Sequence, residues 1–201
     1  MEDGLNPEPE IAHPVILYSL LSACKRHDGP AYRQLSDALS ITVENVGKLV
    51  EQDVLLGSKP LTDALSHIAR SGHYAAIAEL AGRESFSHLS HRFPSFAHID
   101  LKRALPNAFH KAVNASSRLL EGLYRPLKIG ILRQRDSYFL EVRGSPFVSA
   151  HAIVPQCGFF SGFIKEAVRT ATGHDCQMEE AVCAACDKAS TFCIFTVSPP
   201  K

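Results

Sequence analysis

The stretch CGFFSGFIKEAVRTATGHDCQMEEAVCAACDKASTFCIFTV, residues 157–197, decides how the fold of this chain is interpreted. It begins with apolar residues at helical spacing, and Gly173 is a natural end for that helix. Residues 176–187 and 190–197 follow as a predicted closing pair of strands. Five of the six cysteines also lie in this stretch, so the last elements of the fold carry a concentration of thiols.

The segments just before this stretch pass from helical to strand-like periodicity. Residues 105–124 have the pattern of an amphipathic helix. Residues 127–147 contain two predicted strands, KIGIL and SYFLEV, joined by the polar turn RQRD. The order β-β-α-β-β after a helix indicates an α/β fold of the α+β type, in which residues 101–201 form an antiparallel sheet packed with helices.

Residues 1–100 are predicted to be an all-helical N-terminal region, with breaks at Gly72 and Gly82. Within it, residues 31–56 have an apolar spacing that a helix-turn-helix could use, and a plain helical hairpin is the preferred explanation of that spacing. The second helix of that unit, TVENVGKLVEQD, has one lysine and three acidic residues. A helix that lies among phosphates should be basic, so this composition counts against DNA binding.

The composition narrows the role of the cysteines. Lys+Arg and Asp+Glu each number 21, so the net charge is zero. The chain therefore has no overall positive charge that would attract nucleic acid or a membrane surface. No apolar run approaches the roughly 18 residues that span a membrane, and the acidic start MEDGLNPEPE lacks the features of a signal peptide. We therefore expect a cytoplasmic protein with reduced thiols, which leaves metal binding or core packing as their roles.

The C-terminal stretch resembles the 4-vinyl reductase domain family, which includes sensory domains of phenol- and toluene-responsive activators and a protein of bacteriochlorophyll synthesis. The firm match covers residues 143–197. It consists of Ser145-Pro146, Cys157, Ser161-Gly162-Phe163, Gly173, Glu180-x-x-Cys183 and Cys193-Ile194-Phe195. The resemblance implies a fold shared with subunits of the vesicle-tethering transport particle, and with it a homodimer.

The resemblance also implies a structural zinc ion held by Cys157, Glu180, Cys183 and Cys193. Thiolates and a carboxylate are suitable ligands for tetrahedral zinc, and a shell filled by protein side chains is typical of a structural site. The nine residues between Cys183 and Cys193 are two more than the family pattern has, and Cys186 is an alternate ligand for this reason. Reduced core cysteines without a metal are the competing interpretation.

The family implies an enclosed pocket for a small apolar or aromatic ligand. The chain has no tryptophan, so the polar partner of such a ligand is expected to be His110, with His151 second. The candidate lining residues are aromatic, and each is equally explained as ordinary core: Phe109, Tyr124, Tyr138, Phe147, Phe159, Phe160 and Phe163.

The leading prediction is a zinc-stabilised domain that binds a hydrocarbon, aromatic or tetrapyrrole-like ligand and acts as a sensor or carrier. A one-component transcription regulator with an N-terminal helix-turn-helix is the first alternative. An accessory protein of (bacterio)chlorophyll 4-vinyl reduction and a trafficking-type scaffold are two others. No nicotinamide or flavin motif is present, so catalysis by the chain itself is the less favoured role.

Overall fold

We describe a computed structural model of the chain, covering residues 10–91, 105–148, 157–184, 186 and 190–199. The α-helices of these residues are α1 Pro14–His27, α2 Gly29–Leu39, α3 Val43–Gln52, α4 Lys59–Ile68, α5 Tyr74–Ser90, α7 Leu105–Leu123 and α8 Gly158–Thr172. The strands are β1 Ile11–Ala12, β2 Leu56–Gly57, β3 Tyr124–Arg125, β4 Lys128–Gln134, β5 Ser137–Arg143, β6 Gln177–Val182 and β7 Phe192–Ser198. The predicted α+β class is confirmed, including a mostly helical N-terminal region.

Local sequence explains where the helices begin and end. His13 caps α1 by accepting a hydrogen bond from the Val15 N–H, and Pro14 suits the first turn because it has no N–H to leave unpaired. Gly173 ends α8 in a left-handed conformation with φ 78°, as the sequence predicts. No helix in the described part of the chain is both long enough and apolar enough to cross a membrane.

The larger sheet is antiparallel and has the strand order β4-β5-β7-β6. Alternate residues of each strand point to one face, so Leu140 on β5 and Phe195 on β7, which are register partners, are both buried under the helices. Their neighbours Phe139 and Ile194 line a hollow of about 440 Å³ on the other face. β4 is an edge strand, and its Leu132 is 66% exposed.

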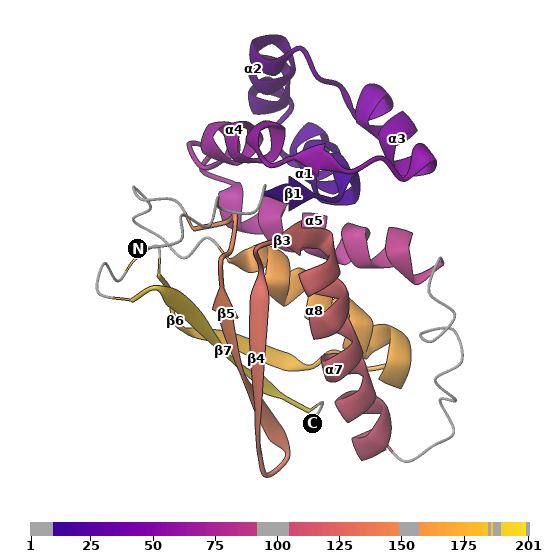
Figure 1. The fold of residues 1–201 in the computed structure, drawn as a ribbon, viewed down its shortest axis with the longest axis vertical. Helices are drawn as coiled ribbons and strands as arrows, with labels where there is room; N and C mark the ends of the chain where they lie inside the picture. The colour runs from indigo at the N-terminus through magenta and orange to yellow at the C-terminus, as the bar shows by residue number, and fades with distance from the viewer. Residues whose placement is uncertain (1–9, 92–104, 149–156, 185, 187–189, 200–201) are drawn as a thin grey trace, which may run out of the picture.

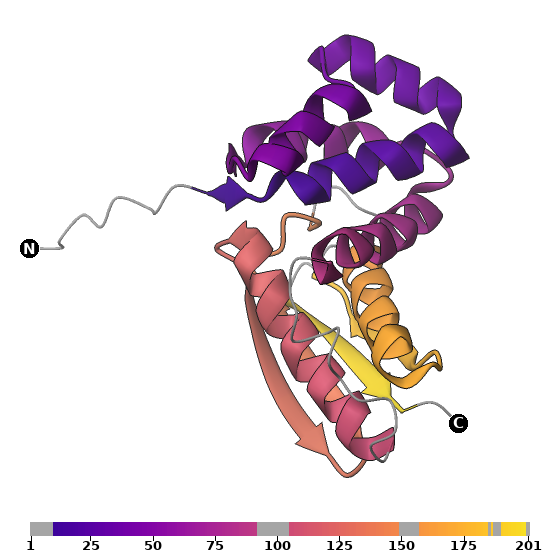
Figure 2. The same ribbon diagram turned by 90° about the vertical axis from the view of Figure 1, so that its right-hand side faces the viewer.

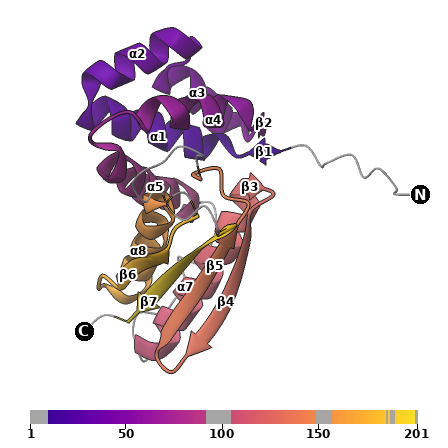
Figure 3. The same ribbon diagram turned by 90° about the vertical axis from the view of Figure 1, so that its left-hand side faces the viewer.

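The molecule is layered (Figures 1 and 2). Helices α7 and α8 lie side by side on the inner face of the sheet, α5 packs on α8, and α1 packs on α5. Helices α2, α3 and α4 form the end of the molecule farthest from the sheet, as Figure 3 shows. A second small sheet of order β2-β1-β3 joins this helical end to the strand that follows α7.

The contact between α5 and α8 depends on glycine. A Cβ atom on Gly82 of α5 would lie 2.0 Å from the Phe159 carbonyl oxygen, and one on Gly162 of α8 would lie 1.9 Å from the Glu79 carbonyl oxygen. The prediction that Gly82 breaks a helix is therefore wrong. Gly82 lies inside α5, where the missing side chain lets the two helix backbones approach each other.

Candidate functional site

Three segments meet at the end of the sheet where α8 begins. Cys157 is the residue before α8, Glu180 lies on β6, Cys183 follows β6, and Cys193 lies on β7. Their potential ligand atoms, three sulfurs and a carboxylate oxygen, all lie within 4.8 Å of one another. The Sγ atoms of Cys157 and Cys193 are 3.2 Å apart. We call these four residues the sulfur cluster.

An irregularity in strand pairing helps to form the sulfur cluster. The pairing of β6 with β7 shifts register between Glu180 and Val182, as a β-bulge does. Beyond the bulge, the N–H of Ala184 donates a hydrogen bond of 3.4 Å to the Cys193 sulfur. The connection from β6 to β7 is longer than in the family pattern, yet it returns Cys183 to the side of Cys193.

The sulfur cluster is buried, and burial disfavours the charged forms of its thiol and carboxyl groups. Burial, followed by the neighbouring Cys183 thiol, raises the pKa of Glu180 to about 9. Hydrogen bonds with Cys183 and Cys193, together with burial, raise the pKa of Cys157, whereas the bond from Cys157 lowers the pKa of Cys193. Without a cation, Cys157 and Glu180 therefore favour their protonated, neutral forms.

One atom of the sulfur cluster lacks the partner that burial requires. Oε1 of Glu180 is buried and forms no hydrogen bond within the described part of the chain, while the carboxyl group as a whole is in hydrogen-bonding contact with the thiols of Cys183 and Cys157. A buried carboxylate oxygen is normally paired with a donor or a cation. Once they lose their protons, the three thiols and the Glu180 carboxyl group form a ligand set that can hold one metal ion with four protein ligands. Cys186 is exposed and lies outside this group.

The aromatic residues expected to line a ligand pocket lie in the core. Phe147 stacks on Phe159 with ring centroids 4.7 Å apart, and its other close ring neighbour is Phe160, at 5.4 Å. Phe163 contacts Phe159 on one side and Phe86 of α5 on the other. These rings fill the space around α8 by packing on one another, and their role as ligand contacts stays a prediction.

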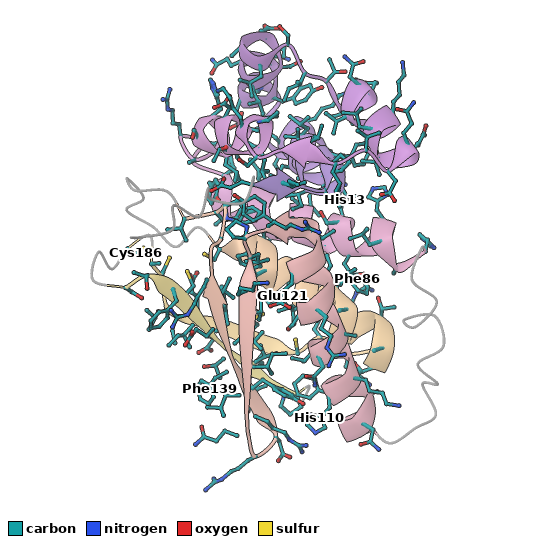
Figure 4. The ribbon with its side chains drawn as sticks, in the orientation of Figure 1. His13, Phe86, His110, Glu121, Phe139 and Cys186 are labelled. Atoms are coloured by element: carbon teal, nitrogen blue, oxygen red, sulfur yellow. The ribbon has the colours of Figure 1, made fainter. Side chains whose placement is uncertain are left out.

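The remaining candidates form two separate groups. Phe109 and His110 lie on α7 against Tyr138 of β5, with the Tyr138 hydroxyl 2.7 Å from Nδ1 of His110. Tyr124 lies on β3, where its hydroxyl contacts Glu10. Figure 4 shows His110 on the lower part of α7, at the opposite end of the sheet from Cys186. His151 lies outside the described residues.

Two features of this region were missed in the sequence. Tyr74, the first residue of α5, is buried, and burial and then Cys157 raise its pKa. The start of α5 lies close to the start of α8, since a Cβ atom on Gly158 would be 3.3 Å from the Ala75 carbonyl oxygen. No local pattern marks Tyr74, because its neighbours are brought in by tertiary packing. The second feature is the spacing Cys183-x-x-Cys186, which is visible in the sequence as CAAC and is a signal of paired thiols.

No family model and no curated protein matches this chain. Solved structures with the same fold do match, among them several H-NOX proteins. A variant H-NOX protein from K. algicida in the Fe(II) unliganded state has 10% identity and a TM-score of 0.60, covering 94% of this chain and 97% of its own. The Fe(II)NO form of an H-NOX protein from S. oneidensis has 11% identity and a TM-score of 0.58, covering 94% and 99%. A Fe(II)CO form from Shewanella oneidensis has 13% identity and a TM-score of 0.54, with the same coverage.

These matches correct the resemblance drawn from the sequence. The solved structures that share the fold are consistently H-NOX domains, so the assignment to the 4-vinyl reductase family is wrong. The expected structural zinc ion rested on that family, and it is wrong as well, because the fold neighbours are described as Fe(II) proteins and one concerns the redox potential of heme. Short cysteine and glycine spacings specify a local turn and a helix end, which different families can share.

The described residues do not fit a heme. Heme iron needs an axial side chain, most often histidine, that faces an apolar pocket. No histidine in the described ranges is buried, and Nδ1 of His110 is already paired with Tyr138. The apolar space around α8 is filled by Phe147, Phe159 and Phe160. The sulfurs of the sulfur cluster face one another, with Cys157 and Cys193 in contact, which leaves no room for a porphyrin between them.

Proposed function

We propose that this chain is a sensor domain on the H-NOX fold whose sensing centre is a thiophilic transition-metal ion bound by the sulfur cluster. The observation that carries the proposal is the buried, unpaired Oε1 of Glu180 beside three sulfurs within 4.8 Å. Thiolates select soft ions, and metal binding would release the protons held by Cys157 and Glu180. The fold similarity supports a sensing role, since H-NOX structures are reported in several ligation states.

The number of ligands decides how such a sensor works. Four protein ligands complete a tetrahedral shell, so no open position remains for a gas or a substrate. The signal is then the presence or absence of the ion rather than a molecule bound to it. This distinguishes the proposed centre from a catalytic metal site, which keeps an open position.

The position of the sulfur cluster supports transmission of that signal. Its Cys157 is the residue before α8, and the start of α8 packs on the start of α5 at Gly158 and Ala75. The two helices are in backbone contact at Gly82 and Gly162, and α5 packs on α1. A displacement of Cys157 on metal binding would therefore move α8 together with α5.

Cobalt(II) titration of the reduced protein under anaerobic conditions tests the proposal. We expect one cobalt per chain, with the intense thiolate-to-metal absorption of a tetrahedral site. Cys157→Ser should abolish these bands, whereas Cys24→Ser, which changes a buried cysteine of α1, should keep them. Absence of cobalt–thiolate absorption in the reduced wild type would overturn the proposal, as would equal loss in both variants.

Other roles stay predictions. A transcription regulator would use residues 31–56, which correspond to α2 and α3, and both helices pack on α1. Homodimer formation, cytoplasmic location, a carrier role and a trafficking-type scaffold role likewise stay predictions. The accessory role in (bacterio)chlorophyll synthesis rested on the 4-vinyl reductase resemblance and is withdrawn with it.

A further inference from the structure

A second thiol lies immediately outside the sulfur cluster. Cys183 and Cys186 are three positions apart, and the N–H of Cys186 donates a hydrogen bond of 3.0 Å to the Cys183 carbonyl oxygen. This tight turn brings the two side chains together, and the Cys186 thiol is in hydrogen-bonding contact with the Cys183 thiol. The pair has the spacing of the Cys-x-x-Cys motif of dithiol–disulfide proteins.

The two thiols differ in their access to solvent. Cys186 is exposed and Cys183 is 8% exposed, while Cys157 and Cys193 are completely buried. A reagent in solution therefore meets Cys186 first and Cys183 next. Figure 4 shows Cys186 at the outer end of β6, away from the helices that cover the sheet. The exposed cysteine is thus positioned as an entry point to the buried group.

We propose that Cys183 and Cys186 are a redox modification site, which a hydroperoxide converts to a disulfide that withdraws Cys183 from the sulfur cluster. The formation of the disulfide stands on the geometry of the pair alone. Its consequence, the loss of one metal ligand and release of the ion, rests on the proposed function.

The chemistry balances as a two-electron oxidation. The Cys186 thiolate attacks one peroxide oxygen, the O–O bond breaks, and hydroxide leaves and takes up a proton as water. The sulfur is then a sulfenic acid. The Cys183 thiol attacks that sulfur, the S–S bond forms, and the sulfenic oxygen leaves as a second water with the thiol proton. Two thiols and one hydrogen peroxide give one disulfide and two waters, and a dithiol reductant reverses the change.

Peptide mapping tests the disulfide. The reduced protein is treated with hydrogen peroxide, its free thiols are alkylated, and it is digested with trypsin. Cleavage after lysine and arginine places Cys183 and Cys186 in peptide 170–188, while Cys157 lies in 144–165 and Cys193 in 189–201. We expect an internal disulfide in peptide 170–188, mapped to Cys183 and Cys186 by fragmentation and removed by a dithiol reductant.

Several results would overturn the inference. A crosslink between peptides 144–165 and 189–201 would show that Cys157 and Cys193 are oxidised instead. A disulfide to Cys176, which is also in peptide 170–188, or sulfinic acid at Cys186 without a disulfide, would reject the pair as well. The pair would also be rejected if both thiols stayed unmodified at peroxide concentrations that oxidise free cysteine.

Cadmium(II) is redox-inert, so it can report metal binding by the sulfur cluster separately from disulfide formation. In cadmium-loaded wild type, peroxide should remove the thiolate–cadmium absorption as the disulfide forms. Cys186→Ser should bind cadmium equally and keep it under peroxide, while Cys24→Ser should behave as wild type. Equal cadmium loss from Cys186→Ser would overturn the switch. If the reduced wild type binds no cadmium and no cobalt, the proposed function fails, and the peptide map still decides the disulfide.

Discussion

At the scale of single residues, the same chemical group serves different purposes according to its surroundings. Cys24 is a small core residue of α1, where burial raises its pKa to about 11. Cys157, equally buried, faces other sulfurs and a carboxyl group. Cys186 is exposed at a turn. Because spacing alone does not give burial, only the structure separates a packing cysteine from a clustered or an accessible one.

Replacing Phe160 tests whether the aromatic group is tightly packed core. Phe160 is 1% exposed and contacts the rings of Phe147 and Phe195. We expect Phe160→Ala to lower the free energy of unfolding by about 3–5 kcal/mol, because it leaves a cavity in the core. Phe139→Ala, on the outer face of the sheet, is the matched control and should cost less. Urea denaturation measures both, and equal costs would contradict a packed interior.

Glu79 should make stability depend on acid pH. Burial raises its pKa, but Lys165, at 3.2 Å, and Arg83 outweigh this, so the pKa lies below the ordinary value of 4.5. The stabilisation is present above pH 4.5 and is lost as pH falls through the lowered pKa. Glu79→Gln should therefore lower the melting temperature at pH 7 and reduce its fall on acidification to pH 3. Glu51→Gln, which changes an exposed residue of α3, should leave the decrease in melting temperature between pH 7 and pH 3 unchanged.

At the scale of elements, α5 and α8 form the contact on which the rest of the core is built. Gly158 and Gly162 are four residues apart and therefore lie on one face of α8, where they meet Ala75 and Glu79 of α5. Phe86 and Phe163 continue the contact one turn farther, edge to face at 5.3 Å. Small residues permit close approach, and the phenylalanines beyond them supply buried apolar area.

Adding one methyl group to this contact should be costly. The Cβ atom of Gly162→Ala would lie 1.9 Å from the Glu79 carbonyl oxygen, so one helix must shift. We expect a loss of about 1–3 kcal/mol of unfolding free energy, as for other overpacked sites. Gly122→Ala in α7 is the matched control, since nothing lies within 4 Å of its added Cβ, and it should stabilise by up to about 1 kcal/mol. Chemical denaturation should show opposite signs for the two variants.

The elements show how far sequence reasoning reaches. The limits of α1, α7 and α8 and of the β4–β5 pair follow from periodicity and from Gly173, because these signals act within one segment. Gly82 is needed because the Phe159 backbone, 77 positions later in the sequence, packs against it. Local sequence signals do not include this contact, so they predict a helix break at Gly82. The predicted strand 176–187 ends at Val182 for a similar reason, since the bulge and the turn at Cys183 follow from contacts with β7.

At the scale of the whole molecule, the four residues of the sulfur cluster could be named from the sequence, but the elements that pack around them could not be predicted. The resemblance to the 4-vinyl reductase pattern implied Cys157, Glu180, Cys183 and Cys193, and the fold brings these side chains together although that family assignment is wrong. The proximity of Tyr74 required packing between distant halves of the chain. The fold was also beyond the local pattern, because the H-NOX structures that share it match 90–94% of the chain at only 10–14% identity.

Metal loading should stiffen one region of the molecule and spare another. Hydrogen exchange is expected to slow in β6, in β7 and at the starts of α5 and α8, because these segments meet at the sulfur cluster. Helices α2 and α3 lie at the far end and should not change. Cadmium(II) and mass-spectrometric detection allow the comparison, with Cys157→Ser as the unloaded control. Uniform protection of all segments would argue against a local centre.

The exposed strand β4 has a consequence for the behaviour of concentrated solutions. It ends the four-stranded sheet, and in the described part of the chain one row of its amides and carbonyls has no neighbouring strand. Lys128 and Arg133 lie on it and repel a second copy of the same edge. Salt screens that repulsion, since the Debye length falls from about 10 Å at 0.1 M to about 3 Å at 1 M ionic strength. Turbidity should therefore appear first in concentrated, high-salt samples, so low ionic strength is the better condition for storage.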